Sequence, residues 1–138
     1  MSARQLTLDL FESLNSGDRD RLRDLISDDA TIVFPRFAPQ PIFTGPSGVD
    51  TFVDWIAQHF PCLTVVIEAL SVAAPGAAGE AETVVVEWSD AGRTSDGRTF
   101  ENSGVTVIVV HGERISTART YLDTVALAHS LGIAVHAG

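Results

Sequence analysis

The chain contains no lysine: all nine of its lysine-or-arginine positions hold arginine. This absence excludes a Schiff-base lysine, and with it one route to covalent chemistry on a carbonyl group. Cysteine is nearly absent as well, because Cys62 is the single one. An internal disulfide and a cluster of thiolate metal ligands are therefore excluded, a pattern typical of a reducing compartment. We expect the protein to be cytoplasmic.

Positive charge and long apolar runs are also scarce. The chain has 18 acidic residues against 9 basic ones, a formal net charge of −9. Such a surface repels phosphate backbones and anionic lipid headgroups, so we expect no nucleic acid and no membrane as partner. No stretch resembles a signal peptide or a membrane span. No histidine pair has ligand spacing with a carboxylate, and the glycines of 76–79 lack the helix and lysine of a phosphate loop. We therefore expect no metal and no cofactor.

What the chain does have is apolar periodicity. With 138 residues, 45% of them hydrophobic, it is long enough for one domain, 1–138, with a real core. Capping residues and helix breakers predict three helices before residue 61: one from Ser2 to Gly17, a short one capped by Asp18, and one that starts at Ser47 and Asp50 and ends before Pro61. Their apolar stripes are Leu6, Leu10, Phe11 and Leu14; Leu22, Leu25 and Ile26; and Val49, Phe52, Val53, Ile56 and Phe60.

From Leu63 onward the period changes to two, which is typical of half-buried strands. The strands expected are Ala30–Pro35, Leu63–Ala73, Ala81–Ala91, Thr99–His111 and Arg114–Asp123, with a long loop over 36–47 and a last helix over Thr124–Leu131. Turn signals at Pro75-Gly76, Asp96-Gly97 and His111-Gly112 separate the last four strands. The predicted fold class is α+β: a cone-shaped, curved antiparallel sheet with three N-terminal helices packed on its concave face.

The turns also predict which side chains share a face of the sheet. A two-residue turn at Asp96-Gly97 pairs Trp88 with Val105, and a second one at Gly112-Glu113 pairs Val105 with Thr120. The face predicted to meet the helices consists of Val84, Val86, Trp88, Val105, Val107, Val109, Ala118, Thr120 and Leu122. The other face consists of Val85, Glu87, Ser89, Asn102, Thr106, Arg119, Tyr121 and Asp123. Because this second face is only half polar, we expect it to pair with a second copy in a homodimer.

An apolar pocket between the sheet and the helices predicts a small hydrophobic molecule as the partner. The predicted lining is Leu10, Leu14, Phe34, Phe43, Trp55, Phe60, Val86, Trp88, Ser103, Val105, Val107 and Thr120. Both tryptophans are interpreted either as core packing or as rings on which a ligand stacks.

Three acidic residues are candidate catalytic groups: Asp123, Glu101 and Asp90. Asp123 directly precedes the last helix, so it is either a helix cap or a site residue. Glu101 has the parity of Val105 on its strand, as does Ser103, which we place opposite Asp90. Glu101 and Asp90 are therefore expected at the rim of the pocket, either as proton-transfer groups or as solvated residues at strand ends.

Five short motifs are spread over nearly the whole chain: Asn15-Ser16-Gly17-Asp18, Asp28-Asp29-Ala30-Thr31 before Pro35, Asp96-Gly97-Arg98, Gly112-Glu113-Arg114-Ile115, and Arg119-Thr120-Tyr121-Leu122-Asp123. Together they resemble the SnoaL-like branch of the nuclear transport factor 2-like superfamily. The resemblance implies a cystatin-like, nuclear transport factor 2-like cone. It leaves the activity open, because ketosteroid isomerases, polyketide cyclases, epoxide hydrolases and non-catalytic binders share this fold.

The resemblance also implies that the acid–base positions of these relatives are not retained. The base of ketosteroid isomerase corresponds to Phe34, its oxyanion tyrosine falls near Leu10, and its protonated aspartic acid falls near Val105. The aspartate of epoxide hydrolases corresponds to Thr120, and that of polyketide cyclases falls on Thr120 or Asp123. The inherited chemistry is therefore either lost or moved to other residues.

Three functions follow from this sequence. The leading hypothesis is a cyclase or isomerase that acts on a hydrophobic, carbonyl-bearing substrate, for example a polyketide-derived one. The alternative is a binding protein of the same fold that holds an apolar ligand without turnover. The third is a dimerisation module whose cavity is filled by side chains. A cavity that reaches Glu101 or Asp90 favours the enzyme.

Overall fold

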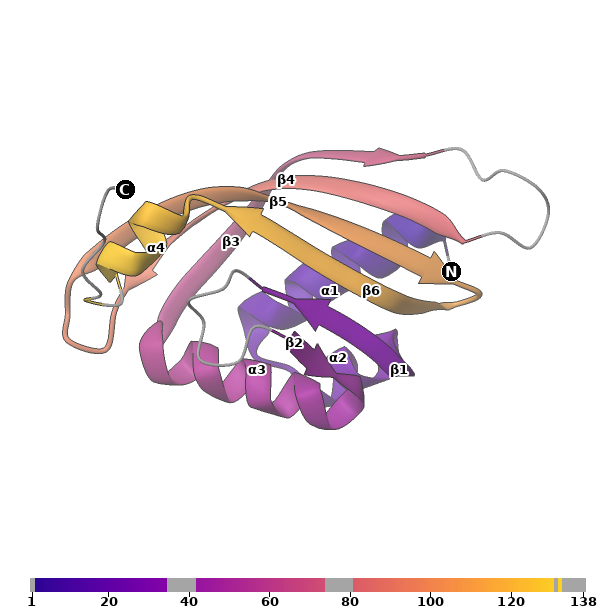
Figure 1. Cartoon of the computed structure of the whole chain (residues 1–138), viewed down its shortest axis with the longest axis horizontal. Coiled ribbons are helices and arrows are strands. Elements are labelled where there is room, and N and C mark those ends of the chain that lie inside the picture. The colour runs from indigo at the N-terminus through magenta and orange to yellow at the C-terminus, as the bar shows by residue number, and fades with distance from the viewer. Residues whose placement is uncertain (1, 35–41, 74–80, 131, 133–138) are drawn as a thin grey trace.

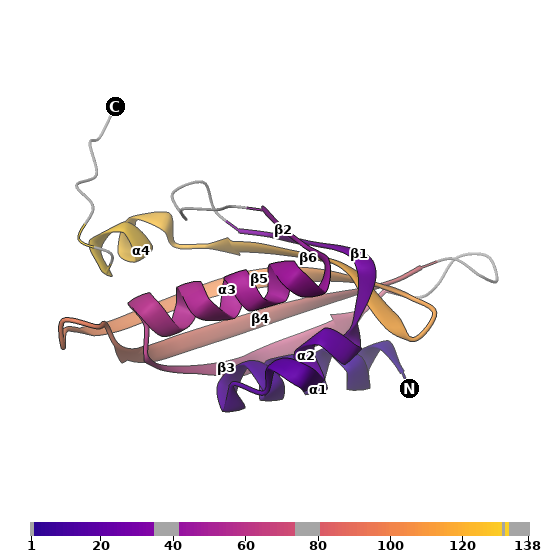
Figure 2. The same ribbon diagram turned by 90° about the horizontal axis from the view of Figure 1, so that it is seen from below.

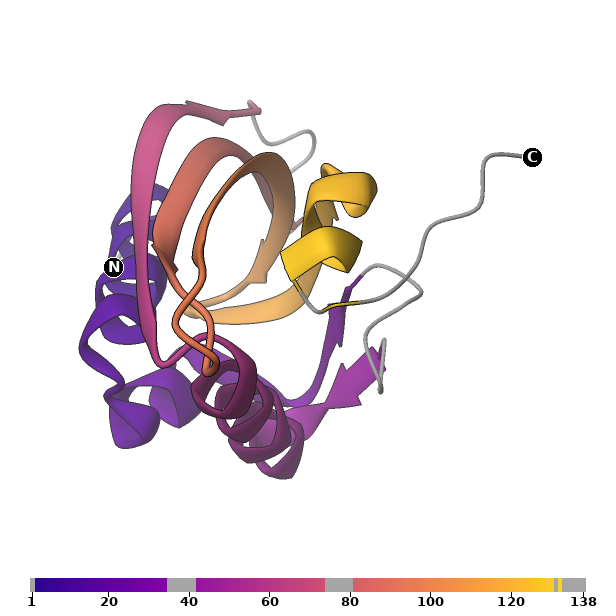
Figure 3. The same cartoon turned by 90° about the vertical axis from the view of Figure 1, so that its left-hand side faces the viewer.

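The computed structural model describes residues 2–34, 42–73, 81–130 and 132. In this part of the chain a six-stranded sheet curves around helices α1, α2 and α3, and α4 lies at one end of it (Figure 1, Figure 2). Figure 3 shows the curvature of the sheet end-on. The elements are α1 (Ala3–Ser16), α2 (Arg19–Leu25), β1 (Ile26–Val33), β2 (Ile42–Thr44), α3 (Gly45–His59), β3 (Cys62–Val72), β4 (Glu82–Arg93), β5 (Thr99–His111), β6 (Arg114–Leu122) and α4 (Thr124–Ser130). The predicted α+β class is confirmed.

Helix α1 starts and ends at its predicted caps, and α2 starts at its predicted cap but ends at Leu25, so Ile26 of the predicted stripe belongs to β1. The Ser2 hydroxyl accepts a hydrogen bond from the Gln5 backbone N–H at 3.1 Å, and the Asp18 carboxylate accepts one from the Arg21 N–H at 3.1 Å. Gly17 ends α1 in the left-handed conformation, with φ of 72°.

Helix α3 starts earlier than predicted. Its N-cap is Thr44, which makes no side-chain cap bond, and Pro46 lies in the first turn. The fixed φ of proline suits that turn, so neither Ser47 nor Asp50 is needed as a start signal. The predicted loop 36–47 therefore contains strand β2 and the beginning of a helix, while its residues up to 41 lie outside the described part of the chain.

The sheet has the strand order β2-β1-β6-β5-β4-β3. Four of its five pairs are antiparallel, and the predicted antiparallel meander of the last four strands is confirmed. Strand β1 runs parallel to β6, so the sheet is not antiparallel at this one pair. Strand β1 also starts at Ile26 rather than at Ala30, and the exposed pair Asp28 and Asp29 belongs to the strand. The predicted turn at Pro75-Gly76 lies outside the described residues.

The connection from β4 to β5 is longer than the predicted two-residue turn. Arg93 pairs with Thr99, so the loop comprises residues 94–98. The Thr94 backbone N–H donates to the Arg98 carbonyl at 2.8 Å, and the Thr94 hydroxyl accepts from the Arg98 N–H at 3.1 Å. These bonds close a loop that shifts the strand pairing by one residue from that of the two-residue turn predicted at Asp96-Gly97. Trp88 consequently pairs with Gly104 instead of Val105.

The connection from β5 to β6 is the predicted turn at Gly112-Glu113, but a β-bulge follows it. Val110 pairs with Ile115 whereas Val109 pairs with Thr117, which leaves Ser116 as the extra residue. The Ser116 hydroxyl donates to the Val109 carbonyl at 3.1 Å. Thr120 therefore pairs with Thr106 instead of Val105.

These two shifts of one residue reverse the faces of β5 alone. The even-numbered side chains Phe100, Thr106, Ile108 and Val110 are buried against the helices, whereas Val105, Val107 and Val109 point outward. The prediction that these valines fill the interior is wrong. On β6 the second shift reverses the effect of the first, so Ala118, Thr120 and Leu122 lie on the inner face as predicted.

Candidate functional site

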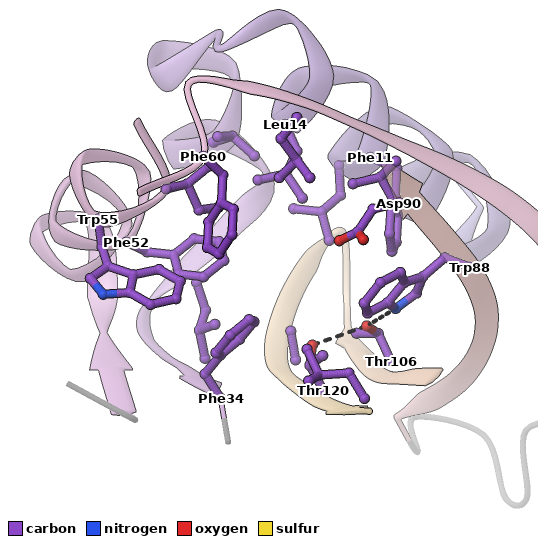
Figure 4. Close-up of a pocket in the computed structure, with 18 of the residues that line it drawn as sticks. Phe11, Leu14, Phe34, Phe52, Trp55, Phe60, Trp88, Asp90, Thr106 and Thr120 are labelled. Carbon is purple, nitrogen blue, oxygen red and sulfur yellow. Dashed lines mark hydrogen bonds between the residues drawn. The ribbon is translucent and has the colours of Figure 1, made fainter. Parts of the chain in front are cut away.

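An apolar cavity of ≈130 Å³ lies between the inner face of the sheet and helices α1 to α3, and α4 contributes Leu127 and Ser130 to its wall (Figure 4). An engineered protein cavity of about 150 Å³ binds benzene, so a space of this volume holds roughly one ring. Seven of the side chains predicted to line a pocket do line it: Leu10, Leu14, Phe34, Trp55, Phe60, Trp88 and Thr120.

The other five predicted lining residues lie elsewhere. Val86 is fully buried between the sheet and the helices, and Phe43 is buried against the Phe52 ring, with ring centroids 5.2 Å apart. Ser103, Val105 and Val107 are on the outer face of β5, because that strand has the opposite parity to the one predicted.

Aromatic rings form one end of the cavity wall. Phe34 makes edge contacts with Phe52 at 5.7 Å and with Trp55 at 5.6 Å between ring centroids. Phe60 in turn contacts Trp55 at 5.9 Å and Phe100 at 4.8 Å. Edge-to-face packing of this kind holds each ring in place, so this end of the cavity has a fixed shape.

Asp90, near the end of β4, is the acidic side chain on this wall. One of its carboxylate oxygens is buried and has no hydrogen-bond partner. Burial raises the pKa of the Asp90 carboxyl from 3.8 to about 6, and a hydrogen bond from the Asn102 backbone opposes that shift. Figure 4 shows the carboxylate beside Phe11 and Trp88. An ionisable group with an unpartnered oxygen at an apolar cavity is a candidate for proton transfer.

A short chain of hydrogen bonds lies on the same wall. The Trp88 indole N–H donates to the Thr106 hydroxyl at 2.9 Å, and the hydroxyls of Thr106 and Thr120 are 3.0 Å apart (Figure 4). Thr106 is buried, and both threonines line the cavity. The cavity therefore combines an apolar lining with two polar features, the Asp90 carboxylate and this chain.

A scan against protein-family models matches residues 8–118 to the family described as "SnoaL-like domain". The chain belongs to this family. Solved structures agree with the fold: a protein of unknown function similar to nuclear transport factor 2 from Burkholderia pseudomallei has a TM-score of 0.81 at 16% identity, with 94% of this chain and 97% of that chain covered.

Two further structures are similar to this SnoaL-like chain. A loop-truncation variant of IdmH is 26% identical, with a TM-score of 0.73 and coverage of 95% and 100% of the two chains. A proposed SnoaL-like polyketide cyclase from Jannaschia sp. CCS1 is 19% identical, with a TM-score of 0.76 and coverage of 96% and 92%. A search of curated proteins gives no significant match.

The other two predicted acids of this SnoaL-like domain lie away from the cavity. Asp123 caps α4, since its carboxylate accepts a hydrogen bond from the Ala126 N–H at 3.0 Å. Glu101 is exposed on the outer face of β5, so its predicted place on the pocket face is wrong. Among the positions implied by the superfamily, Leu10, Phe34 and Thr120 line the cavity, whereas Val105 faces outward.

Among the polar and aromatic wall residues that the predicted lining lacks are Asn102, Thr106 and Phe52. Asn102 and Thr106 were assigned to the outer face through the wrong register of β5. Phe52 already belonged to the predicted stripe of α3, so a signal for it existed. No group of three metal-ligating side chains occurs in the described ranges, and no helix there is long and apolar enough to cross a membrane.

Proposed function

We propose that this SnoaL-like protein is an enzyme of the isomerase or cyclase type that moves a proton on a hydrophobic, carbonyl-bearing molecule held in the cavity, with Asp90 as the proton-transfer group. The observation that carries the proposal is the unpartnered, buried carboxylate oxygen of Asp90 on a mostly apolar wall. Polyketide-derived carbonyl compounds are the first substrate class to test.

The chemistry follows from the state of this carboxylate. With a pKa of about 6, Asp90 is a stronger base than an ordinary aspartate, and it is still roughly nine-tenths ionised at pH 7. The carboxylate takes a proton from a carbon next to, or conjugated with, the carbonyl group. The electron pair of that C–H bond moves onto the carbonyl oxygen as an enolate, and Asp90 becomes a neutral acid.

The second half of the reaction returns the proton. In an isomerase, Asp90 gives it back to a different carbon of the same skeleton. In a cyclase, the enolate carbon attacks a second carbonyl group, and the proton goes to the alkoxide that forms. The apolar lining lowers the local dielectric constant, which strengthens the electrostatic contacts made to the enolate.

Proton exchange on carbon tests the proposal. Octalone, a bicyclic conjugated enone, is incubated in D₂O with the wild type and with Asp90→Asn, and deuterium incorporation at carbon is followed by proton NMR. We expect exchange with the wild type and a loss of at least about 100-fold in Asp90→Asn, the contribution typical of a general base. Glu101→Gln removes one carboxylate from the exposed outer face and is the matched control, with wild-type exchange expected.

A binding protein without turnover is the second candidate. It is favoured by the apolar side chains Leu10 and Phe34, which line the cavity at positions where catalytic relatives are expected to have acid–base groups. Native mass spectrometry of the protein purified from its own host would then show a retained small molecule. Equal exchange rates in the wild type and Asp90→Asn would support this candidate over the enzyme.

A further inference from the structure

We infer that Thr120 is the oxygen-recognising residue of the cavity: its hydroxyl donates a hydrogen bond to a carbonyl or enolate oxygen of the ligand, at the opposite end of the Trp88 ring from Asp90. The inference depends on the proposed function only for the class of ligand. The side chains of Trp88, Thr106 and Thr120 form the chain of hydrogen bonds on the cavity wall.

These three side chains contain one more hydrogen than their mutual bonds use. An indole has one N–H and accepts nothing, and each threonine hydroxyl has one O–H and can also accept. Three polar hydrogens therefore serve two hydrogen bonds, Trp88 to Thr106 and the bond between the threonines. One hydroxyl hydrogen is left, on the wall of an apolar cavity.

The Trp88 N–H favours one assignment of the spare hydrogen. Since Trp88 only donates, Thr106 accepts from it, and a chain that continues in the same direction is strengthened by mutual polarisation. Thr106 then donates to Thr120, and Thr120 is the end of the chain. Thr106 is buried, with 5% of its surface exposed, whereas Thr120 is only partly buried. The free donor is thus the more accessible of the two hydroxyls.

The positions on the strands separate this donor from the proton-transfer group. Asp90 on β4 pairs with Asn102, and Thr120 on β6 pairs with Thr106, which is two inward positions further along β5. These positions are roughly 13 Å apart along a flat strand and two strand spacings of about 4.8 Å apart across the sheet, and the concave curvature brings the side chains closer together. The inward position between them is Gly104, where an added Cβ would lie 2.7 Å from the Trp88 ring. The indole therefore occupies the space between the two polar ends.

This arrangement fits a ligand whose oxygen is remote from the carbon that loses the proton. In a conjugated enone, removal of the proton at the far end of the conjugated system places negative charge on the carbonyl oxygen. A neutral donor at that oxygen stabilises the charge as it develops. The proposed substrate class is therefore a flat, conjugated carbonyl compound with one ring, or slightly more, inside the cavity.

The test compares octalone with octalin, the corresponding hydrocarbon, in wild type, Thr120→Val and Thr120→Ser. The NMR signals of the two indole N–H groups follow binding of both probes, and octalone labelled with carbon-13 at its carbonyl reports the hydrogen bond directly. We expect Thr120→Val to bind octalone about two- to tenfold more weakly, with an upfield carbonyl shift and unchanged octalin binding. Thr120→Ser, which keeps the hydroxyl, should retain the wild-type preference.

Two outcomes would overturn the inference. One is a wild-type protein that binds octalone no more tightly than octalin, and the other is a carbonyl signal that is the same in wild type and Thr120→Val. Asp90→Asn distinguishes this inference from the proposed function. It should keep the carbonyl preference, so a failure of Asp90 as the base would show as lost exchange chemistry with the Thr120 signature intact.

Discussion

Asp90 on β4 and Asn102 on β5 are direct partners in the sheet, and both line the cavity. The Asn102 backbone donates to the Asp90 carboxylate, while the Asn102 side-chain amide donates to the Asp123 carbonyl at 3.1 Å. Asn102 thus connects the proposed base to the end of β6, where α4 begins. The carboxylate accepts this hydrogen bond from Asn102, and its Oδ1 oxygen is buried without a hydrogen-bond partner.

Asp90→Asn should stabilise the folded protein at neutral pH. The raised pKa means that the folded chain binds this proton more tightly than the unfolded chain does, so the stability that Asp90 contributes is full below about pH 4 and is lost as the pH rises through 6. We expect the variant to be more stable by about 1–2 kcal/mol at pH 7.5, a value reduced for the partial exposure of the group. Urea unfolding at pH 7.5 and pH 4 measures the difference, which should shrink at the lower pH.

The matched control for this measurement is Glu101→Gln, on the outer face of the neighbouring strand. It removes the same charge from an exposed position, and its stability should stay within about 0.5 kcal/mol of the wild type. If Asp90→Asn were less stable than the wild type at pH 7.5, burial of the ionised Asp90 carboxylate would not be destabilising, which would contradict this prediction.

Gly104→Ala should damage the cavity. An added Cβ at this inward position would lie 2.5 Å from the Tyr121 carbonyl oxygen and 2.7 Å from the Trp88 ring, and neither contact is tolerated without movement. We expect a loss of about 1–3 kcal/mol in unfolding free energy and a shifted NMR signal of the Trp88 indole N–H. Ser103→Ala, one residue away on the outer face, is the control and should change neither quantity. An unchanged indole signal in Gly104→Ala would show that Trp88 does not lie over Gly104.

Much of the fold follows from local signals in the sequence. Ser2, Gly17 and Asp18 lie at helix ends because their side chains or backbone conformations satisfy the terminal N–H and C=O groups, an effect that acts within one turn of chain. The sequence also predicts that Asp90 points inward, because it lies two residues from Trp88 on the same strand and alternate side chains share a face. Local alternation needs no knowledge of a partner strand.

The register of β5, in contrast, could not be predicted from local signals in the sequence. It depends on the width of the 94–98 loop, which Thr94 closes, and on the bulge at Ser116. Both threonine and serine are common within strands and loops, so neither marks these features in the sequence. A shift of one residue is small in energy for the loop, yet it moves Thr106 and Asn102 from the outer face into the site.

Arg98 should hold α4 over its end of the cavity. Its guanidinium donates to the carbonyls of His129 and Ser130, at 3.1 and 3.0 Å, in the last turn of that helix, and it is positioned by the Asp96 carboxylate at 2.9 Å. Arg98→Lys keeps the charge but loses the planar pair of donors. We expect amide hydrogen exchange in 124–130 to become about five- to tenfold faster.

The control for this effect is Arg93→Lys at the exposed end of β4, which should leave exchange in 124–130 unchanged. Wild-type exchange in Arg98→Lys would mean that the packing of Leu127 against Trp55, Phe60 and Phe100 suffices to hold the helix.

The outer face of the sheet is more apolar than the sequence predicts, because the valines of β5 point outward. Val107 lies between Val85 and Arg119, and Val105 lies between Glu87 and Tyr121. Tyr121 is 58% exposed and Val85 is 38% exposed. A face of this kind favours association, and a twofold contact would bury the same residues of both copies. We propose that this outer face is the interface of a homodimer.

Light scattering coupled to size exclusion tests the dimer: the expected mass is twice 14.7 kDa. Tyr121→Glu should shift it to the mass of one chain, because twofold symmetry brings a new carboxylate from each copy into the same desolvated interface. Val125→Glu, at a similarly exposed apolar position on α4, is the control and should remain dimeric. A wild-type mass of 14.7 kDa at micromolar concentration would contradict the proposed dimer. The outer valines of β5 would then face water, whereas the inner face of the sheet is covered by the helices.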